Sequence, residues 1–375
     1  MEATETTASR AANILGRPFD INGLSLRNRI AMAPMTREFS PDGVPGADVA
    51  EYYARRAAGG VGLIITEGTY VDHASAGSSH RVPHFHGDAA LDGWRRVADA
   101  VHAAGGRIVP QLWHVGATRD EGQGPVPAAP PAGPSGLALD GTAKGRTMTG
   151  ADIDAVIGAF ADSAAAAERL GFDGVELHGA HGYLIDQFLW STTNRRTDGY
   201  GGDLASRTRF AAEIVEAVRA AVSPTFPVIF RLSQWKAYAF DAKLATDPAE
   251  LDALLSPLAA AGVDAFHAST RRYWLPEFDG ADLNLAGWVK KLTGKATLSV
   301  GSVGLDKEFV GTAGFAERAT STGIDLLLDR MERDEFDVIA VGRSLIADPE
   351  WANKAMTGRL AEAAPYDASL LRTLV

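Results

Sequence analysis

Short apolar runs alternate along this chain with longer, alanine-rich stretches of helical periodicity. Most of the runs are apolar throughout rather than at every second position, which is typical of parallel strands covered on both faces. Eight runs are predicted as strands: 29–33, 61–65, 107–112, 174–177, 228–232, 265–268, 297–300 and 338–341. The clearest helical stretches run from Asp48 to Gly59, then over 89–104, 150–170, 204–222 and 248–261. Asp48 and Thr149 are plausible N-caps, and glycines follow most of the last helical residues.

Eight strands joined by eight crossovers predict a (β/α)₈ barrel. A doubly wound α/β sheet is the alternative, but its first strand should lead into a Gly-x-Gly-x-x-Gly turn, and the chain contains no such motif. Residues 19–26 are predicted to form a β-hairpin with Asn22-Gly23 at the turn, which would plug the N-terminal end of the barrel. Residues 122–136, after the third strand, are too rich in Pro and Gly for a helix or strand. They are expected to form a rim or lid on the catalytic face, or a simple surface excursion.

Composition narrows the class of protein. The chain has 375 residues, 46% of them hydrophobic, and 36 basic against 47 acidic side chains give a net charge of −11. This balance predicts a globular protein, and its acidity argues against nucleic acid or an anionic membrane as the main partner. Cysteine is absent, which excludes disulfides, a thiolate nucleophile and a Cys-ligated iron–sulfur cluster.

The chain ends and the apolar content predict location and domain organisation. Residues 1–12 are small, polar and acidic, and are expected to form a disordered tail ahead of a single barrel domain over 13–375. They lack the basic start and apolar core of a signal peptide, and no stretch reaches the roughly 18 apolar residues of a membrane span. We therefore expect a soluble cytoplasmic protein, and leave open whether it forms a homo-oligomer.

Candidate chemistry lies where the predicted strands end, because barrels of this type carry their reactive residues at the C-terminal ends of strands. Six ends are polar or glycine-rich: Pro34-Met35-Thr36-Arg37, Gln111-Leu112-Trp113-His114, His178-Gly179-Ala180-His181-Gly182-Tyr183, Arg231, Gly301-Ser302-Val303-Gly304 and Gly342-Arg343. Six such ends around one rim indicate a single site.

The last two strand ends predict a phosphate site. Loops after strands seven and eight are the recurrent phosphate cradle of these barrels. Glycine lets backbone N–H groups approach the oxygens at Gly301 and Gly342, and Arg343 adds a guanidinium. The alternative is that the glycines only form tight turns.

The segment containing His178, His181 and Tyr183 is the sharpest feature of the sequence. Imidazole N–H groups can stabilise charge developing on a substrate oxygen, and a phenol can deliver a proton. Two alternatives remain: metal ligation by Glu176, His178 and His181, or a polar cluster satisfied inside the barrel.

Two further strand residues need partners. Arg231 lies in a buried strand, where an unpaired charge is costly, so either an anionic ligand or a structural Asp or Glu should meet it. Gln111 carries both a donor and an acceptor and could recognise the edge of a planar ring.

Together these residues resemble the old yellow enzyme family of FMN-dependent ene-reductases, in its threonine-bearing branch. The resemblance covers nearly the whole chain, from "NRIAMAPMTR" to "VIAVGRSLIADPEW", and its most specific block is "GVELHGAHGYLIDQFLWSTTNRRTDGYGGDLASRTRF". It implies a (β/α)₈ barrel that holds FMN noncovalently at its C-terminal face, with NADPH or NADH as reductant. The implied flavin contacts are Pro34, Met35, Thr36, Gly68, Gln111 and Arg231 around the ring, and Gly301, Ser302, Gly342 and Arg343 at the phosphate.

The resemblance also implies a reaction. Hydride from flavin N5 would reach the β-carbon of an α,β-unsaturated carbonyl or nitro compound, while His178 and His181 bond its activating oxygen and Tyr183 protonates the α-carbon. Many relatives have Asn at the position of His181. Small electron-poor alkenes are thus the expected partners.

Other aromatic and histidine residues are less defined. Trp113 is expected to form a wall of the substrate pocket. Tyr273 and Trp274 either close over the substrate or only pack. The His-rich region 73–86 is interpreted as a solvated or rim loop that departs from known relatives. The competing functions are a metal-dependent lyase or hydrolase on the same barrel, and a flavin-binding redox module without efficient turnover.

Overall fold

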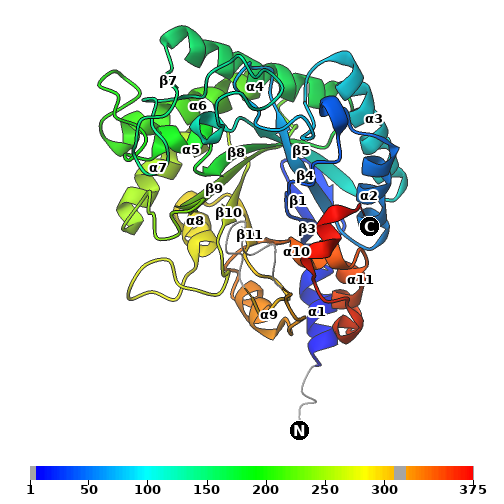
Figure 1. Ribbon diagram of the computed structural model, residues 1–375. Helices are drawn as coiled ribbons and strands as arrows, with labels where there is room; N and C mark the ends of the chain where they lie inside the picture. The colour runs from blue at the N-terminus through cyan, green and yellow to red at the C-terminus, as the bar shows by residue number, and fades with distance from the viewer. Residues whose placement is uncertain (1–5, 308–317, 375) are drawn as a thin grey trace.

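Eight parallel strands close into a barrel in the computed structural model, which describes residues 6–307 and 318–374 (Figure 1). Around the barrel the strand order is β10-β11-β12-β3-β4-β5-β8-β9. The barrel strands are β3 (Ile30–Met32), β4 (Leu63–Tyr70), β5 (Arg107–Trp113), β8 (Val175–His181), β9 (Val228–Lys236), β10 (Ala265–Ser269), β11 (Ala296–Val300) and β12 (Val338–Val341). All eight overlap the predicted runs, so the predicted (β/α)₈ architecture is confirmed.

Three strands continue beyond the apolar runs that predicted them. β4, β8 and β9 each run four or five residues further towards their C-terminal ends than 61–65, 174–177 and 228–232. Parallel pairing extends these strands: His178 lies opposite Arg231 in the β8–β9 register. The polar residues at the strand ends are therefore fixed by the sheet itself rather than by flexible loops.

Helices surround the barrel and complete the crossovers (Figure 1). They are α2 (Ala47–Ala58), α3 (Asp88–Ala103), α4 (Gly150–Arg169), α5 (Leu184–Leu189), α6 (Leu204–Ala221), α7 (Pro248–Ala261), α8 (Leu285–Thr293), α9 (Asp325–Glu332), α10 (Arg343–Ala347) and α11 (Trp351–Met356). Single 3₁₀ turns occur at η1 (Pro41–Gly43), η2 (Gly116–Thr118), η4 (Leu360–Glu362) and η5 (Ala368–Arg372). Thr149 caps α4 as predicted, in a reciprocal capping box with Asp152. Asp48 is not a cap, because α2 begins one residue earlier, after Gly46.

The predicted disordered tail is wrong for residues 7–12, because helix α1 spans Thr7–Leu15. The Thr6 side chain caps it by accepting from the Ser9 backbone N–H at 3.2 Å. One face of α1 buries Ala11, Ile14 and Leu15, and this packing outweighs the polar composition of the segment. Residues 1–5 of the predicted tail lie outside the described residues.

A hairpin closes the N-terminal end of the barrel, as predicted. β1 (Phe19–Ile21) pairs antiparallel with β2 (Leu24–Leu26). The turn residues Asn22 and Gly23 have φ of +47° and +89°, the left-handed pair that such a two-residue turn requires. Ile21, Leu24 and Leu26 pack into one cluster with residues of the barrel interior, which leaves the opposite end for the site.

The Pro/Gly-rich segment 122–136 follows β5 as expected. The prediction that it contains no strand is wrong for two residues, because Ala132–Gly133 form the short strand β6, which pairs with β7 (Arg146–Thr147). Among the described residues, no helix is long and apolar enough to cross a membrane.

Candidate active site

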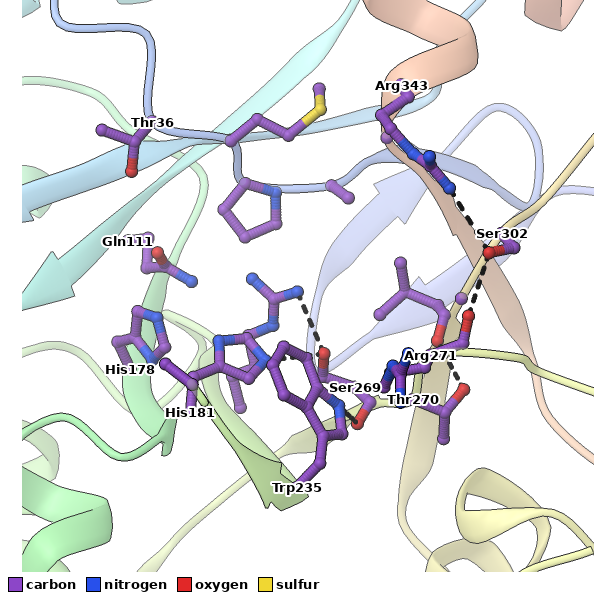
Figure 2. Close-up of a pocket in the computed structure, with 18 of the residues that line it drawn as sticks. Thr36, Gln111, His178, His181, Trp235, Ser269, Thr270, Arg271, Ser302 and Arg343 are labelled. Atoms are coloured by element: carbon purple, nitrogen blue, oxygen red, sulfur yellow. Dashed lines mark hydrogen bonds between the residues drawn. The ribbon is translucent and has the colours of Figure 1, made fainter. Parts of the chain in front are cut away.

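A cavity of about 610 Å³ opens at the C-terminal ends of the barrel strands. Seven of the eight strands, or the loops that follow them, contribute to its lining. The lining residues are Ala33, Pro34, Met35, Thr36, Arg37, Glu38, Gln111, Trp113, His178, His181, Tyr183, Arg231, Trp235, Ala237, Tyr238, Phe240, Ser269, Thr270, Arg271, Val300, Gly301, Ser302, Val303, Leu305, Gly342, Arg343 and Leu371. Figure 2 shows Gln111 and the two histidines on one side of the cavity and Ser302 and Arg343 on the opposite side.

His181 owes its position to a left-handed turn at the end of β8. His181 and Gly182 have φ of +65° and +85°, a conformation that favours glycine over other residues. The backbone N–H of His181 donates to Ser233 Oγ at 2.9 Å, and that of Gly182 donates to Asp186 Oδ2 at 2.6 Å. These bonds hold the turn and thereby bring His181 back towards His178, with ring centroids 5.2 Å apart.

Both imidazoles are held neutral. Burial and the nearby Arg231 guanidinium lower the pKa of His178 and that of His181 well below the usual value. Nδ1 of His178 is buried without a hydrogen-bond partner. Two neutral imidazoles on one wall can donate hydrogen bonds to a ligand oxygen and still accept charge developing on it.

Tyr183 stands edge-on to its neighbours. Its ring lies 4.8 Å from that of Trp113 and 5.0 Å from that of His178, at 81° and 78°. Burial raises the pKa of Tyr183 to about 12. The phenol therefore keeps its proton at neutral pH, which a proton donor needs.

Arg231 is a buried cation, 6% exposed, that faces the cavity. Within residues 6–307 and 318–374, no carboxylate lies within ion-pair distance of its guanidinium, and Nε has no hydrogen-bond partner. Burial lowers its pKa, opposed by the charge of Glu176. Such a group fits an anionic or electron-rich ligand edge.

Beneath the cavity lies a buried polar layer that the sequence did not reveal. Glu176 accepts from Gln111 Nε2 at 2.7 Å through one oxygen and contacts His267 Nδ1 at 2.6 Å through the other. Gln111 therefore keeps its amide oxygen for a ligand. His267 was not predicted as part of the site, because it is 91 residues from Glu176 and stands in an otherwise apolar run.

The same layer bears on the alternative in which Glu176 would ligate a metal ion. Both of its carboxylate oxygens are engaged by Gln111 and His267 rather than turned towards the His178–His181 pair. Across the described ranges, no group of three or more His, Asp or Glu side chains is arranged to hold a metal ion.

The opposite end of the cavity carries the predicted phosphate residues. Arg343 Nη2 contacts Ser302 Oγ at 3.4 Å and donates to the Lys307 carbonyl at 2.5 Å. Gly301 is required by its neighbours, because a Cβ there would lie 2.7 Å from the Thr270 carbonyl oxygen. Gly342 and Arg343 begin the short helix α10, directly after β12.

Three of the predicted site residues do not line the cavity. Gly68 does not line the cavity, because the Trp113 ring covers it; a Cβ would lie 2.4 Å from that ring. Tyr273 and Trp274 do not line it either. Their backbone carbonyls accept from Asn284 and Arg330, and their rings pack edge-on at 5.2 Å. These two residues therefore stabilise the loop after β10. The other predicted residues lie in the lining.

Several lining residues were missed in the sequence. The Trp235 ring stacks on the His181 ring with a centroid distance of 4.3 Å, and its centroid lies 6.0 Å from that of the Phe240 ring. Tyr238 is 78% exposed at the mouth. These aromatics follow Arg231 within nine residues, so reading beyond the apolar run of the fifth strand would have found them.

A parallel barrel whose C-terminal cavity is lined by a buried cation, two neutral imidazoles and the Gly and Arg residues after its last two strands is typical of flavin-binding oxidoreductases of the (β/α)₈ class. Residues 15–362 match the NADH:flavin oxidoreductase / NADH oxidase family, and the chain belongs to that family. FMN is therefore its cofactor, and the old yellow enzyme resemblance is confirmed.

Individual relatives agree with this. The chain is 35% identical over 350 residues to an NADH oxidase of Thermoanaerobacter brockii, covering 90% of this chain and 50% of that protein. It is 32% identical over 368 residues to a chanoclavine-I aldehyde reductase of Penicillium roqueforti, covering 93% and 90%. It is also similar to the solved structure of morphinone reductase, with a TM-score of 0.77 and 31% identity, covering 95% and 92%. The matches span about half the length of several curated relatives, at 50%, 55% and 49%.

Proposed function

We propose that this chain is an FMN-dependent ene-reductase that uses NADPH or NADH to reduce small electron-poor alkenes. The observation that carries this proposal is the juxtaposition of His178, His181 and Tyr183 in one cavity with Arg231. Two neutral hydrogen-bond donors and a protonated phenol are the groups needed to activate an α,β-unsaturated carbonyl or nitro compound and to protonate the product.

The lining residues fit FMN. Arg231, with its unpartnered Nε, would face the electron-rich pyrimidine edge of the ring, and Gln111 would contribute its free amide oxygen. Pro34, Met35 and Thr36 would contact the ring from the end of β3. Gly301, Ser302, Gly342 and Arg343 would hold the phosphate. Bound FMN supplies hydride transfer from the nicotinamide to the alkene.

The chain's own residues orient and polarise the substrate. His178 and His181 bond its activating oxygen and stabilise the negative charge that develops there when the β-carbon is reduced. Trp113 forms a wall, since its ring lies against both His178 and Tyr183. Tyr183 then delivers its proton to the α-carbon.

Colour and turnover test the proposal. The purified protein should be yellow, should release FMN on denaturation, and should consume NADPH or NADH in the presence of cyclohexenone with formation of cyclohexanone. Reducible FMN without alkene reduction, across a panel of enones and nitroalkenes, would show a redox module rather than an ene-reductase. A colourless protein that contains stoichiometric zinc would contradict the flavin site as well.

A further inference from the structure

Ser269 lies at the end of β10 between the two sides of the cavity. Its Oγ lies 2.8 Å from His181 Nε2 and 3.4 Å from Arg231 Nη2. Figure 2 shows Ser269 beside the His181 ring, with dashed lines to its partners. Ser269 is 2% exposed, so its hydroxyl hydrogen needs an acceptor within the protein or its ligand.

The direction of these hydrogen bonds follows from the donors available. A guanidinium can only donate, so Arg231 donates to Ser269 Oγ. Within the described parts of the chain, His181 Nε2 is the one acceptor recorded within reach of the Ser269 hydroxyl. A hydroxyl hydrogen directed at Nε2 requires that this nitrogen be unprotonated.

An unprotonated Nε2 determines the protonation of the other ring nitrogen of His181, Nδ1. Burial and the neighbouring Arg231 lower the pKa of His181 well below its usual value, so the ring is neutral and carries one proton. With Nε2 unprotonated, that proton lies on Nδ1. Trp235 stacks on the ring at 4.3 Å and donates its own Nε1–H to the Ser269 carbonyl at 3.1 Å, which restricts rotation of the ring.

We propose that Ser269 is a positioning residue that holds His181 in the Nδ1–H tautomer and so makes it a hydrogen-bond donor to the substrate oxygen. This rests on the proposed ene-reductase function. Without the serine hydroxyl, the ring is free to place its proton on Nε2, which faces β10, and Nδ1 would then meet a substrate oxygen with a lone pair. The same hydroxyl also joins Arg231 to His181, so the cofactor side and the substrate side share one hydrogen-bonded link.

The tautomer can be measured without turnover. The FMN-loaded protein, labelled with ¹⁵N in its histidine rings, should show the Nδ1–H pattern for His181 by NMR, with the signal assigned from its loss in His181→Gln. Ser269→Ala should change that pattern, and Ser269→Thr, which keeps the hydroxyl on a strand, should restore it. Because no substrate is present, this result does not depend on whether the enzyme reduces alkenes.

Ligand affinity gives the second measurement. The affinity of the oxidised holoenzyme for a phenol should fall about tenfold in Ser269→Ala, as expected for the loss of one neutral hydrogen bond. Ser299→Ala is the matched control: Ser299 lies opposite Ala268 in the β10–β11 register, is buried and does not line the cavity, and its loss should leave both readings unchanged.

An Nε2–H tautomer in the unaltered holoenzyme would overturn the proposal, and this holds even where Ser269→Ala fails to retain FMN. An unchanged tautomer and phenol affinity in Ser269→Ala would overturn it too. An absence of alkene reduction in the unaltered protein would instead contradict the proposed function.

Discussion

Lys236 Nζ lies 2.9 Å from Asp186 Oδ1, and both side chains are fully buried, at 0% exposed. The ammonium also donates to the carbonyls of Ser233 and Gln234, while the second oxygen of Asp186 accepts from Gly182. The pair therefore joins the end of β9 to the left-handed turn at His181 and Gly182, and the position of His181 in the cavity depends on it.

Removing one partner of this pair should destabilise the protein strongly. Lys236→Met leaves Asp186 as an uncompensated buried charge, and should lower the free energy of unfolding by about 3–5 kcal/mol. The double variant Lys236→Met, Asp186→Leu should regain much of that loss. Urea unfolding of the FMN-saturated variants measures both. The exposed Arg209–Glu213 pair is the control, since Arg209→Ala should cost less than about 1 kcal/mol. A double variant as unstable as the sum of the single variants would contradict this account.

Glu67 should make stability fall as pH rises towards neutrality. Its side chain is 1% exposed, accepts from the backbone N–H groups of Arg37 and Glu38, and has a pKa that burial raises to about 7. A raised carboxyl pKa means that the folded state binds its proton more tightly than the unfolded state, so the stabilisation is present below about pH 4.5 and is lost by about pH 7.

Glu67→Gln mimics the protonated form. The difference in free energy of unfolding between this variant and the unaltered protein should therefore increase, in favour of the variant, from pH 4.5 to pH 8. The gain is on the order of 3 kcal/mol. Urea unfolding of both proteins at these pH values, with FMN saturating, measures it. The same difference in stability at both pH values would show that Glu67 does not titrate in this range.

Tyr183→Phe should separate the two halves of the proposed reaction. Loss of the phenol should slow alkene reduction by roughly 10²–10⁴-fold, the range for a general acid, and leave reduction of FMN by NADPH within about twofold. Stopped-flow measurement of the two half-reactions makes the comparison. Equal slowing of both would indicate a structural role for the ring, which packs against Trp113 and His178.

Arg343 should discriminate FMN from riboflavin, which lacks the phosphate. Arg343→Ala should weaken FMN binding by roughly 10–100-fold, as expected for a hydrogen bond to a charged group, while riboflavin binding stays nearly unchanged. Fluorescence titration of the apoprotein with each flavin measures the ratio of the dissociation constants for FMN and riboflavin. An equal loss for both flavins would place Arg343 outside phosphate recognition.

Tyr238 should influence the size of substrate that is accepted. It is exposed and lines the cavity together with Phe240 and Trp235, so Tyr238→Ala should lower kcat/KM for aryl-substituted enones by roughly 3–10-fold, the value of one aromatic contact. Cyclohexenone should be unaffected, because it is too small to reach the mouth. Leu275→Ala, at an exposed apolar residue outside the cavity, is the matched control.

The fold was predictable because strands buried on both faces are apolar throughout. All eight barrel strands follow from that pattern, whereas the hairpin plug was predicted from its Asn22-Gly23 turn and the helix ends from the glycines that follow them. Helix α1 was not predictable in this way, since its helix depends on packing of Ala11, Ile14 and Leu15 against distant parts of the chain. The composition of the segment alone does not indicate that these residues pack against distant parts of the chain.

The candidate site was predictable where its residues are neighbours in sequence. His178, His181 and Tyr183 lie in one segment, and Arg231 stands out in an apolar run. The bond between Glu176 and His267 spans 91 residues and depends on strand register, which the sequence does not specify. The sequence left two alternatives for Tyr273 and Trp274, because aromatic residues near a barrel rim can pack inward under the loop as easily as they can face a ligand.

The backbone at position 181 narrows which amino acids evolution can place there. With φ at +65°, the residue must tolerate a conformation that β-branched side chains reject, and its side chain must still present an N–H to the ligand. Asparagine tolerates the positive φ and carries an N–H donor. Histidine carries the donor but adopts this φ with some conformational strain. Under the proposed function, exchange between these two residues would keep an N–H donor for the substrate oxygen, whereas valine or threonine would strain the backbone.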